Sequence, residues 1–155
     1  MSVNSIDRSA FIARYDSYIQ LILTLAKQLD NVEFDCVLAV IRGGYMPGEI
    51  VSRIFSRPLI VTRLSSYRKG VRGKVQDLGT IGTPFGKILI VDDLADSGES
   101  LKYLKSKYPG AITAVLWNKD KPRDVNPDYY AVRVSDTWIT QPMDMFNRLH
   151  KSTGV

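Results

Sequence analysis

Apolar side chains recur at helical spacing in the N-terminal part of the chain. Positions three or four apart are apolar across residues 7–29, which predicts one long amphipathic helix: Phe11, Tyr15, Tyr18, Ile22, Leu25, Ala26 and Leu29. The pattern then changes to an unbroken apolar run at residues 36–41. A run of this length with no polar face is typical of a strand buried on both faces of a parallel sheet.

Helical and strand patterns continue to alternate along the chain. Pro47 suits the first turn of a helix that runs to about residue 55. Further strands are predicted at residues 59–64, 87–91, 112–117 and 129–134, with a helix at residues 98–107. This order predicts an α/β fold, an open and mostly parallel twisted sheet flanked by helices on both faces. At 155 residues, the chain fits a single domain over residues 1–155.

Residues 65–86 interrupt this alternation. The segment SSYRKGVRGKVQDLGTIGTPFG contains five glycines and a proline and has no sustained period. About 20 residues without regular structure inside a compact domain are typical of a functional lid or of disorder. Taken alone, its basic residues are a solvated surface or a nonspecific nucleic-acid patch.

Composition narrows the chemistry that the chain can perform. The net charge of +5 and the pI of about 9.3 favour anionic partners, either nucleic acid or a small phosphorylated ligand. Cys36 is the only cysteine and His150 the only histidine, which argues against Cys/His zinc sites and Ser-His-Asp catalysis. Without a membrane-length apolar run or a signal-peptide pattern, we expect a cytoplasmic protein with no integral membrane association.

Polar segments follow the predicted strands at one edge of the sheet. IRGG, LSSYRKG and VDDLADSGES each come directly after an apolar run, and WNKDKP follows the next strand. In open parallel sheets, ligands bind beyond the carboxyl ends of the strands. These segments should therefore converge on one ligand site.

The acidic segment has two interpretations from its residues alone. Residues 96–100 form a small-residue loop before a helix, which is either a backbone cradle for phosphate or an ordinary capped helix. Asp92 and Asp93 are either solvated turn residues or groups that hold ribose hydroxyls and a hard cation such as Mg²⁺. The spacing matches neither a P-loop nor a dinucleotide fingerprint.

Several of these motifs resemble one family. VDDLADSGES is similar to the signature with which type I phosphoribosyltransferases bind phosphoribosyl pyrophosphate (PRPP). AVIRGGYMPG, SSY, the Lys119 region and DTWITQP resemble the 6-oxopurine branch, above all bacterial xanthine-guanine phosphoribosyltransferases. The resemblance runs from about residue 37 to residue 145.

The resemblance implies roles for the acidic segment. Asp92 and Asp93 would hold the ribose hydroxyls, with Asp93 nearest the metal of a Mg²⁺–PRPP complex. Asp96 would lie by purine N7 and act as the general base. The 5′-phosphate would be bound by the loop that follows: Ser97, Gly98, Glu99 and Ser100. Since a carboxylate repels phosphate, the Glu99 side chain should turn outward or serve the helix N-terminus.

The other motifs receive roles in the same way. Pyrophosphate would be bound by Arg42, Gly43 and Gly44, beside a cis peptide at Ile41–Arg42. Lys119 would donate to the 6-oxo group, Trp138 would stack on the purine, and the Ile139 backbone would contact its 2-position edge. Without the resemblance, Gly43 and Gly44 would be interpreted as a turn beside a surface arginine. Lys119 would then be a surface lysine and Trp138 a core residue. The lid would close over PRPP with residues that include Ser66, Tyr67, Arg72 and Lys74.

The function implied is transfer of the phosphoribosyl group from PRPP to guanine, xanthine or hypoxanthine in purine salvage, with release of pyrophosphate. The first helix and residues 136–149 would form a hood over the base, and a homodimer or homotetramer is expected. The branch generally has Glu where this chain has Thr140, which leaves the preferred purine open. Two alternatives are a PRPP- or nucleotide-sensing regulator that binds nucleic acid, and a phosphoribosyltransferase for another base. We expect no nucleic-acid partner, because 155 residues leave no room for an added DNA-binding domain.

Overall fold

The computed structural model describes residues 8–65 and 74–147. Six strands form one sheet in the order β3-β2-β1-β4-β5-β6, in which only β3 runs antiparallel to its neighbour. The strands are β1 (Cys36–Ile41), β2 (Leu59–Ser65), β3 (Gln76–Ile81), β4 (Ile88–Ala95), β5 (Ile112–Lys119) and β6 (Tyr129–Val134). The helices are α1 (Arg8–Gln28), α2 (Tyr45–Ile54), α3 (Glu99–Lys107) and α4 (Asp144–Asn147). The predicted mostly parallel α/β sheet is confirmed.

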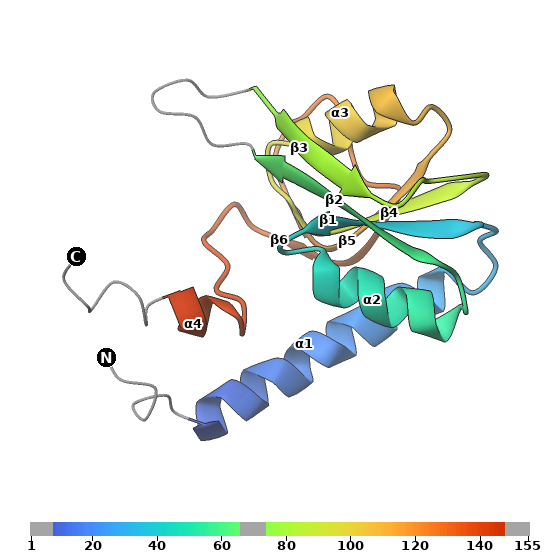
Figure 1. The fold of residues 1–155 in the computed structure, drawn as a ribbon. Coiled ribbons are helices and arrows are strands. Elements are labelled where there is room, and N and C mark those ends of the chain that lie inside the picture. The colour runs from blue at the N-terminus through green and yellow to red at the C-terminus, as the bar shows by residue number, and fades with distance from the viewer. Residues whose placement is uncertain (1–7, 66–73, 148–155) are drawn as a thin grey trace, which may run out of the picture.

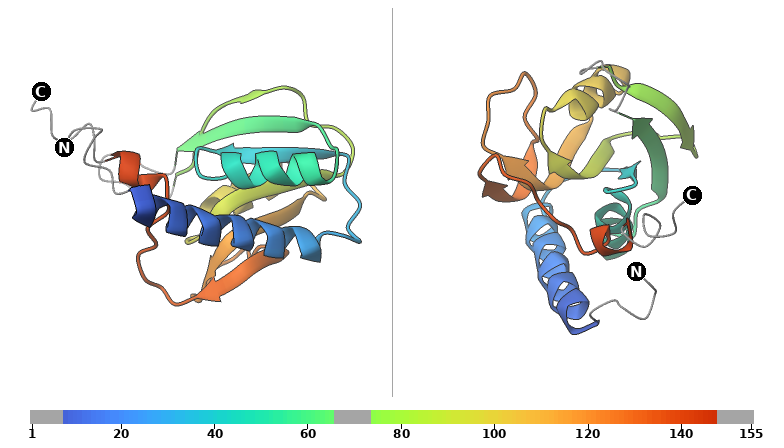
Figure 2. Two further views of the ribbon diagram at one scale, coloured as in Figure 1. Left: turned by 90° about the horizontal axis from the view of Figure 1, so that it is seen from below. Right: turned by 90° about the vertical axis from the view of Figure 1, so that its left-hand side faces the viewer.

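The helices cover both faces of this sheet (Figures 1 and 2). Helices α1 and α2 lie on one face and α3 lies on the other. Successive strand residues point to opposite faces, so Val37 packs with the α1 side chains Ile22 and Leu25 while Leu38 packs with Leu101 of α3. This is why the strand sequences are apolar without alternation.

Strand β4 is longer than the predicted strand at residues 87–91. Its pairing with β1 ends at Ala39–Val91, whereas its pairing with β5 continues to Ala95–Asn118. Asp92 and Asp93 therefore lie inside the strand rather than after it. Because β1 turns away at this point, a crevice opens between β1 and β4 beside the two acids, where the order of the strands along the chain reverses.

Strand β5 also extends beyond its predicted end at residue 117. It continues to Lys119, which pairs with Val134 of β6. Lys119 is thus the last residue of a strand and not part of the loop that follows. The sequence suggested an earlier end because polar side chains begin at Asn118, but ladder hydrogen bonds between backbones continue there.

The segment between β2 and β4 is not entirely irregular. Strand β3 pairs with β2, and the Thr62 and Thr80 hydroxyls hydrogen bond across the ladder at 2.9 Å. Gly79 has φ +109°, a conformation that favours glycine, and the ladder shifts register between Thr62 and Leu64. These irregularities explain why the sequence shows no strand period at this edge. The predicted lid residues Ser66, Tyr67 and Arg72 lie outside the described residues, and Lys74 is exposed.

The helices match their predictions closely, and Pro47 lies in the first turn of α2 as expected. This helix begins at Tyr45, so Pro47 is its third residue, and the Gly44 N–H donates to the carbonyl of Val40 at 2.7 Å. The polar–aromatic segment after β6 has no regular structure until the short helix α4. Among the described helices, none is both long and apolar enough to cross a membrane.

Candidate active site

The loop after β1 forms one side of the crevice. The peptide bond between Ile41 and Arg42 is cis, as the resemblance implied. Gly43 lies directly against the carboxylate of Asp93, since a Cβ at residue 43 would come within 2.1 Å of Oδ2. A Cβ at Gly44 would meet the carbonyl oxygen of Val91 at 2.5 Å. Only glycines allow the loop to approach β4 so closely.

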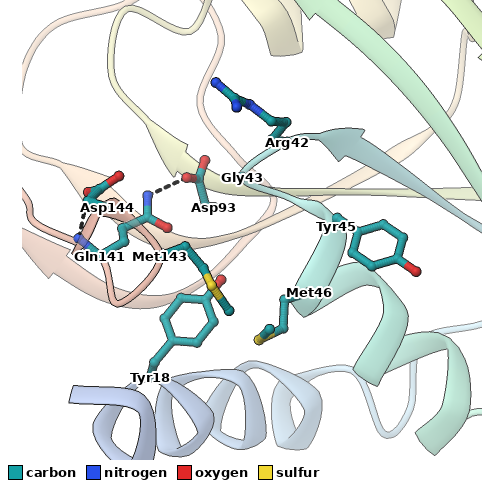
Figure 3. Close-up of a pocket in the computed structure, with 9 residues that line it drawn as sticks. All are labelled: Tyr18, Arg42, Gly43, Tyr45, Met46, Asp93, Gln141, Met143 and Asp144. Carbon is teal, nitrogen blue, oxygen red and sulfur yellow. Dashed lines mark hydrogen bonds between the residues drawn. The ribbon is translucent and has the colours of Figure 1, made fainter. Parts of the chain in front are cut away.

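A pocket of about 530 Å³ lies in this crevice (Figure 3). It joins the predicted residues Arg42, Gly43 and Asp93, and its other walls come from α1, α2 and the C-terminal segment: Tyr18, Tyr45, Met46, Gln141, Met143 and Asp144. The side-chain amide of Gln141 donates to Asp93 Oδ2, and the Gln141 backbone N–H donates to Asp144 Oδ2 at 2.8 Å. The pocket therefore has acidic walls and a basic residue at its rim.

Burial and charge control the ionisation of groups around this pocket. Burial first, and then the negative charge of Asp93, raises the pKa of Asp92 well above its usual range. The Asp93 N–H donates to Asp92 Oδ1 at 2.8 Å. Burial also raises the pKa of Tyr18, as do Asp93 and Asp92 to a smaller extent, so its phenol stays protonated. Tyr18 is 5% exposed, and its ring lies 5.7 Å from that of Trp117.

The loop from β4 to α3 has the geometry of an anion cradle. Gly98 adopts φ +80° directly before the helix, and a Cβ there would meet the Val125 carbonyl at 2.8 Å. The Glu99 N–H donates to Ser97 Oγ at 3.4 Å. Amides in the first turn of a helix lack intrahelical acceptors and lie at the positive end of the helix dipole. The geometry of this loop therefore suits a phosphate, which would compete with Ser97 Oγ for the Glu99 N–H.

Glu99 lies in the first turn of α3. The pKa of Lys102 is raised mainly by its ion pair with Asp124 at 2.7 Å and, to a smaller extent, by Glu99. The Glu99 carboxylate is thus close enough to Lys102 for their charges to interact on the flank of the helix. An acid in a first helical turn is also favourable to the helix dipole.

Four charged side chains meet beside the cradle. Lys119 Nζ lies 3.3 Å from Asp96 and 3.4 Å from Asp136, and Lys121 pairs with both acids too. Lys119 is only 8% exposed. Burial acts to raise the pKa of Asp96, but hydrogen bonds from Lys121 and Lys119 outweigh burial and lower it below its ordinary value. Asp96 is consequently an ionised acceptor in contact with two ammonium groups.

Arg123 fixes the end of β5 behind this cluster. It donates to Asn118 Oδ1 at 2.7 Å and to the carbonyl of Lys119. Its Cδ would lie 3.2 Å from a Cβ at Gly98. Arg123 therefore connects the strand end that carries Lys119 with the backbone of the anion cradle.

The predicted purine contacts occupy different environments. Ile139 packs against the core, whereas Trp138 is 88% exposed and leaves its ring free for a ligand. Thr140 and Pro142 face α1 across a second cavity of about 320 Å³, which Arg14, Ser17, Tyr18 and Leu21 also line. The two segments expected to form a hood, α1 and residues 136–149, thus lie side by side where they are described.

Sequence reasoning assigned no role to several residues of this site: Tyr18, Tyr45, Met46, Lys121, Arg123, Asp136, Gln141, Met143 and Asp144. Lys121 and Arg123 belong to the basic run NKDKPR, and Asp136 and Gln141 to DTWITQP, so the motifs pointed to the region. Tyr18 gave no such signal, because its spacing is that of a core residue.

Oxygen donors suitable for Mg²⁺ are present in the pocket. Asp93 and Asp144 both line it, and Mg²⁺ is commonly bound by one or two carboxylates together with substrate oxygens. Within residues 8–65 and 74–147, no group of three or more His, Cys, Asp or Glu side chains could hold a metal by itself. The donor set therefore fits a metal that arrives with an oxygen-rich substrate.

Curated relatives share most of this chain. A xanthine-guanine phosphoribosyltransferase of Vibrio parahaemolyticus is 33% identical over 140 residues, which cover 87% of this chain and 89% of the relative. A xanthine-guanine phosphoribosyltransferase of Chromohalobacter salexigens is 28% identical over 144 residues, which cover 91% and 89%.

Solved structures share the fold. A purine phosphoribosyltransferase from Pyrococcus horikoshii aligns with a TM-score of 0.68 at 31% identity, covering 79% of this chain and 85% of that one. The xanthine-guanine-hypoxanthine phosphoribosyltransferase of Helicobacter pylori aligns with a TM-score of 0.70 at 24% identity, covering 89% and 96%. The phosphoribosyl transferase domain model matches residues 12–146, and with this match over most of its length the chain belongs to the type I phosphoribosyltransferase family.

Proposed function

We propose that this protein transfers the phosphoribosyl group of PRPP to a 6-oxopurine and releases pyrophosphate. The observation that carries the proposal is the contact of Gly43 with the Asp93 carboxylate at the mouth of the β1–β4 crevice. The contact places the Arg42–Gly44 loop, which suits pyrophosphate, next to Asp93, which suits ribose hydroxyls. The cradle at residues 97–100 follows on the same strand and suits the 5′-phosphate.

The proposed binding of PRPP uses separate groups for its separate parts. Asp92 and Asp93 accept hydrogen bonds from the ribose hydroxyls, and the backbone of residues 97–100 binds the 5′-phosphate. Arg42 and the Gly43–Gly44 backbone bind the pyrophosphate. Asp93 is the residue that would hold Mg²⁺, which when bound neutralises charge on the pyrophosphate. Lys74 and the lid residues 66, 67 and 72 are proposed to close over the pyrophosphate end of PRPP.

The proposed chemistry places Asp96 next to the base. The bond from ribose C1 to the pyrophosphate oxygen breaks while the bond from C1 to purine N9 forms, and Asp96 takes the proton from N7. The ribose gains positive charge in this step, which the nearby carboxylates stabilise. Lys119 donates to the 6-oxo oxygen, and a 6-amino purine is disfavoured because it presents hydrogens there.

The preferred purine is proposed from the groups near its 2-position. Trp138 stacks on the ring, and the Ile139 carbonyl accepts from a 2-amino group or from a ring N–H. Thr140 supplies no carboxylate for the 2-amino group of guanine. We therefore propose that 2-oxo purines are accepted at least as well as guanine.

A base panel tests the proposed function. Purified protein is given PRPP and Mg²⁺ with guanine, xanthine, hypoxanthine, adenine, orotate or uracil, and nucleotide formation is followed by chromatography. We expect turnover with at least one 6-oxopurine and none with adenine or the pyrimidines. Turnover with only a pyrimidine would show that the base site is wrongly assigned. Absence of all turnover, together with tight binding of RNA or DNA, would contradict the enzymatic function.

We also propose that the protein is a homodimer or homotetramer. The edge strand β3 and the turn after it expose large apolar side chains, with Ile81 75% and Phe85 51% exposed. Exposed apolar groups on an edge strand favour association. Light scattering coupled to size-exclusion chromatography measures the mass, and a monomer at all concentrations would contradict this expectation.

A further inference from the structure

We propose that Gln141 is a positioning residue that orients Asp93 and ties the base-binding segment to the ribose-binding strand. The proposal rests on the proposed function, because it assigns Asp93 to PRPP and residues 136–142 to the purine. The new point is that the Gln141 side-chain amide links the PRPP subsite to the purine subsite. It can do so without touching either PRPP or the purine.

The geometry shows how Gln141 is itself held. Its backbone N–H donates to Asp144 Oδ2 at 2.8 Å, and the Asp144 N–H donates back to the Gln141 carbonyl at 3.1 Å. This reciprocal pair closes the turn that begins α4. The side chain of Gln141 then extends from the turn to Asp93 and donates to Oδ2 across the pocket (Figure 3). A fixed backbone makes this amide a directed donor.

The Asp93 carboxylate is confined by its other neighbours. Gly43 lies against it, and a Cβ there would be 2.1 Å from Oδ2 and 2.7 Å from Oδ1. Asp93 is also held through its backbone, because its N–H donates to Asp92 Oδ1. With Oδ2 occupied by Gln141, Oδ1 remains for the substrate. A carboxylate that is oriented beforehand loses less conformational freedom on binding, so PRPP should bind more tightly.

The position of Gln141 in the sequence makes this contact a coupling between subsites. It lies two residues after Ile139 and three after Trp138, in a segment without regular structure between β6 and α4. Its bond to Asp93 spans 48 positions of sequence and fixes that segment to β4. Loss of the bond should therefore disturb both the acid and the order of the base-binding segment.

Two substitutions and a matched control test the proposal. Gln141→Leu removes the donor at similar size, and Gln141→Glu places a second carboxylate against Asp93. Gln28→Leu is the control, because the Gln28 amide also makes one long-range bond, to the Tyr130 carbonyl at 2.8 Å, away from the pocket. We expect PRPP dissociation constants, measured by calorimetry, to rise roughly ten-fold for Gln141→Leu, further for Gln141→Glu and not at all for the control.

Hydrogen–deuterium exchange of the ligand-free protein gives a readout that does not depend on activity. We expect peptides covering residues 139–144 to exchange faster in Gln141→Leu and not in Gln28→Leu. The double variant Asp93→Asn with Gln141→Glu reverses donor and acceptor, so it should exchange more slowly in this segment than Gln141→Glu alone, in which two carboxylates face each other. This rescue is not expected if Gln141 only fills space.

The outcomes separate this inference from the proposed function. PRPP affinity within about two-fold of wild type in Gln141→Leu, with only a lower melting temperature, would overturn the positioning role. Unchanged exchange at residues 139–144 would overturn the coupling. A wild-type protein that binds no PRPP would instead overturn the proposed function, while the exchange and rescue results would still report on the Gln141–Asp93 contact.

Discussion

Lys119 Nζ, at the end of β5, lies 3.3 Å from the carboxylate of Asp96, the residue directly after β4. The register of the sheet explains the contact, because Ala95 pairs with Asn118 and the residues that follow these two, Asp96 and Lys119, are then neighbours. Asp136 flanks the same ammonium at 3.4 Å. A buried ammonium is stable only with such partners. The sheet therefore positions a charged donor and a charged acceptor side by side before any base binds.

Replacing Lys119 should reduce use of the base and spare PRPP. Lys119→Ala removes the proposed donor to the 6-oxo group, so kcat/KM for a 6-oxopurine should fall at least ten-fold, the cost of a lost hydrogen bond to a charged donor. PRPP affinity by calorimetry should stay near wild type. Lys105→Ala is the control, since Lys105 pairs with Asp128 at 3.0 Å at the other end of β5. Equal losses in both variants would mean that the effect is structural.

Lys121 should set the acid limb of the pH–rate profile. Its hydrogen bond is the largest of the effects that lower the pKa of Asp96, ahead of Lys119 and against the opposing effect of burial. In Lys121→Ala the pKa of Asp96 should rise, so its base form is lost at higher pH. The acid limb of kcat/KM should therefore move to higher pH. An unchanged acid limb would show that Asp96 does not control it.

Asp96 itself should affect the chemical step more than binding. Asp96→Asn keeps the size of the side chain and removes its capacity to accept a proton. We expect kcat to fall roughly 10²- to 10⁴-fold, the usual contribution of a general base. Calorimetry should show that PRPP still binds, because the cradle and Asp93 are untouched. Wild-type turnover in this variant would eliminate the proposed role.

Alanine substitutions at Gly98 and Gly110 can distinguish backbone strain from a steric clash in the anion cradle. Gly98 and Gly110 have φ of +80° and +83°, so alanine at either position adopts a left-handed conformation that costs about 1–2 kcal/mol. A Cβ at Gly98 would also meet the Val125 carbonyl at 2.8 Å, whereas nothing lies within 4 Å at Gly110. Denaturation should show stability losses in both, and only Gly98→Ala should lose PRPP affinity. Equal PRPP affinity in the two variants would argue against the cradle.

Hydrophobic pattern was sufficient to predict most of the sheet and its helices. The unbroken run at β1 is buried on both faces, and α3 lies within one residue of its predicted start. The lengths of β4 and β5 were wrong because polar residues interrupt β4 at Asp92 and Asp93 and end β5 at Asn118 and Lys119, while the ladder continues through backbone bonds that no side-chain pattern reveals. Strand β3 was missed for a related reason, since it lies at an edge with several exposed residues.

The candidate site also contains residues that the sequence could identify and residues that it could not. The motifs around Arg42, Gly43 and Asp93 identified groups that the fold brings to one pocket. Gln141 could not be paired with Asp93 from sequence, because a polar residue in an irregular segment indicates nothing about a partner 48 positions away. Tyr18 was interpreted as core, and it is buried, but its ring also forms a wall of the pocket. Local patterns predict local structure, and contacts between loops depend on the whole fold.

Asp77 should make the stability of the protein sensitive to strong acid. Its carboxylate links β3 to α3 by accepting from Lys107 at 2.7 Å and Tyr103 at 2.8 Å. The bond from Lys107, followed by those from the Gly79 N–H and Tyr103, lowers the pKa of Asp77 from 3.8 to about 2. A lowered folded-state pKa stabilises the fold fully above the unfolded value of 3.8, and this contribution disappears as the pH falls through about 2.

Chemical denaturation of the wild type and Asp77→Asn between about pH 2 and pH 6 measures this contribution. The variant should be less stable by about 1 kcal/mol at pH 6, the upper end for ion pairs near the surface. The difference should narrow as the pH falls below 4, because protonation removes the same charge from the wild type. Asp124→Asn is the control, since its partner Lys102 joins it on an exposed flank at 2.7 Å. A difference that stays constant down to pH 2 would show that the charge of Asp77 is not what holds β3 to α3.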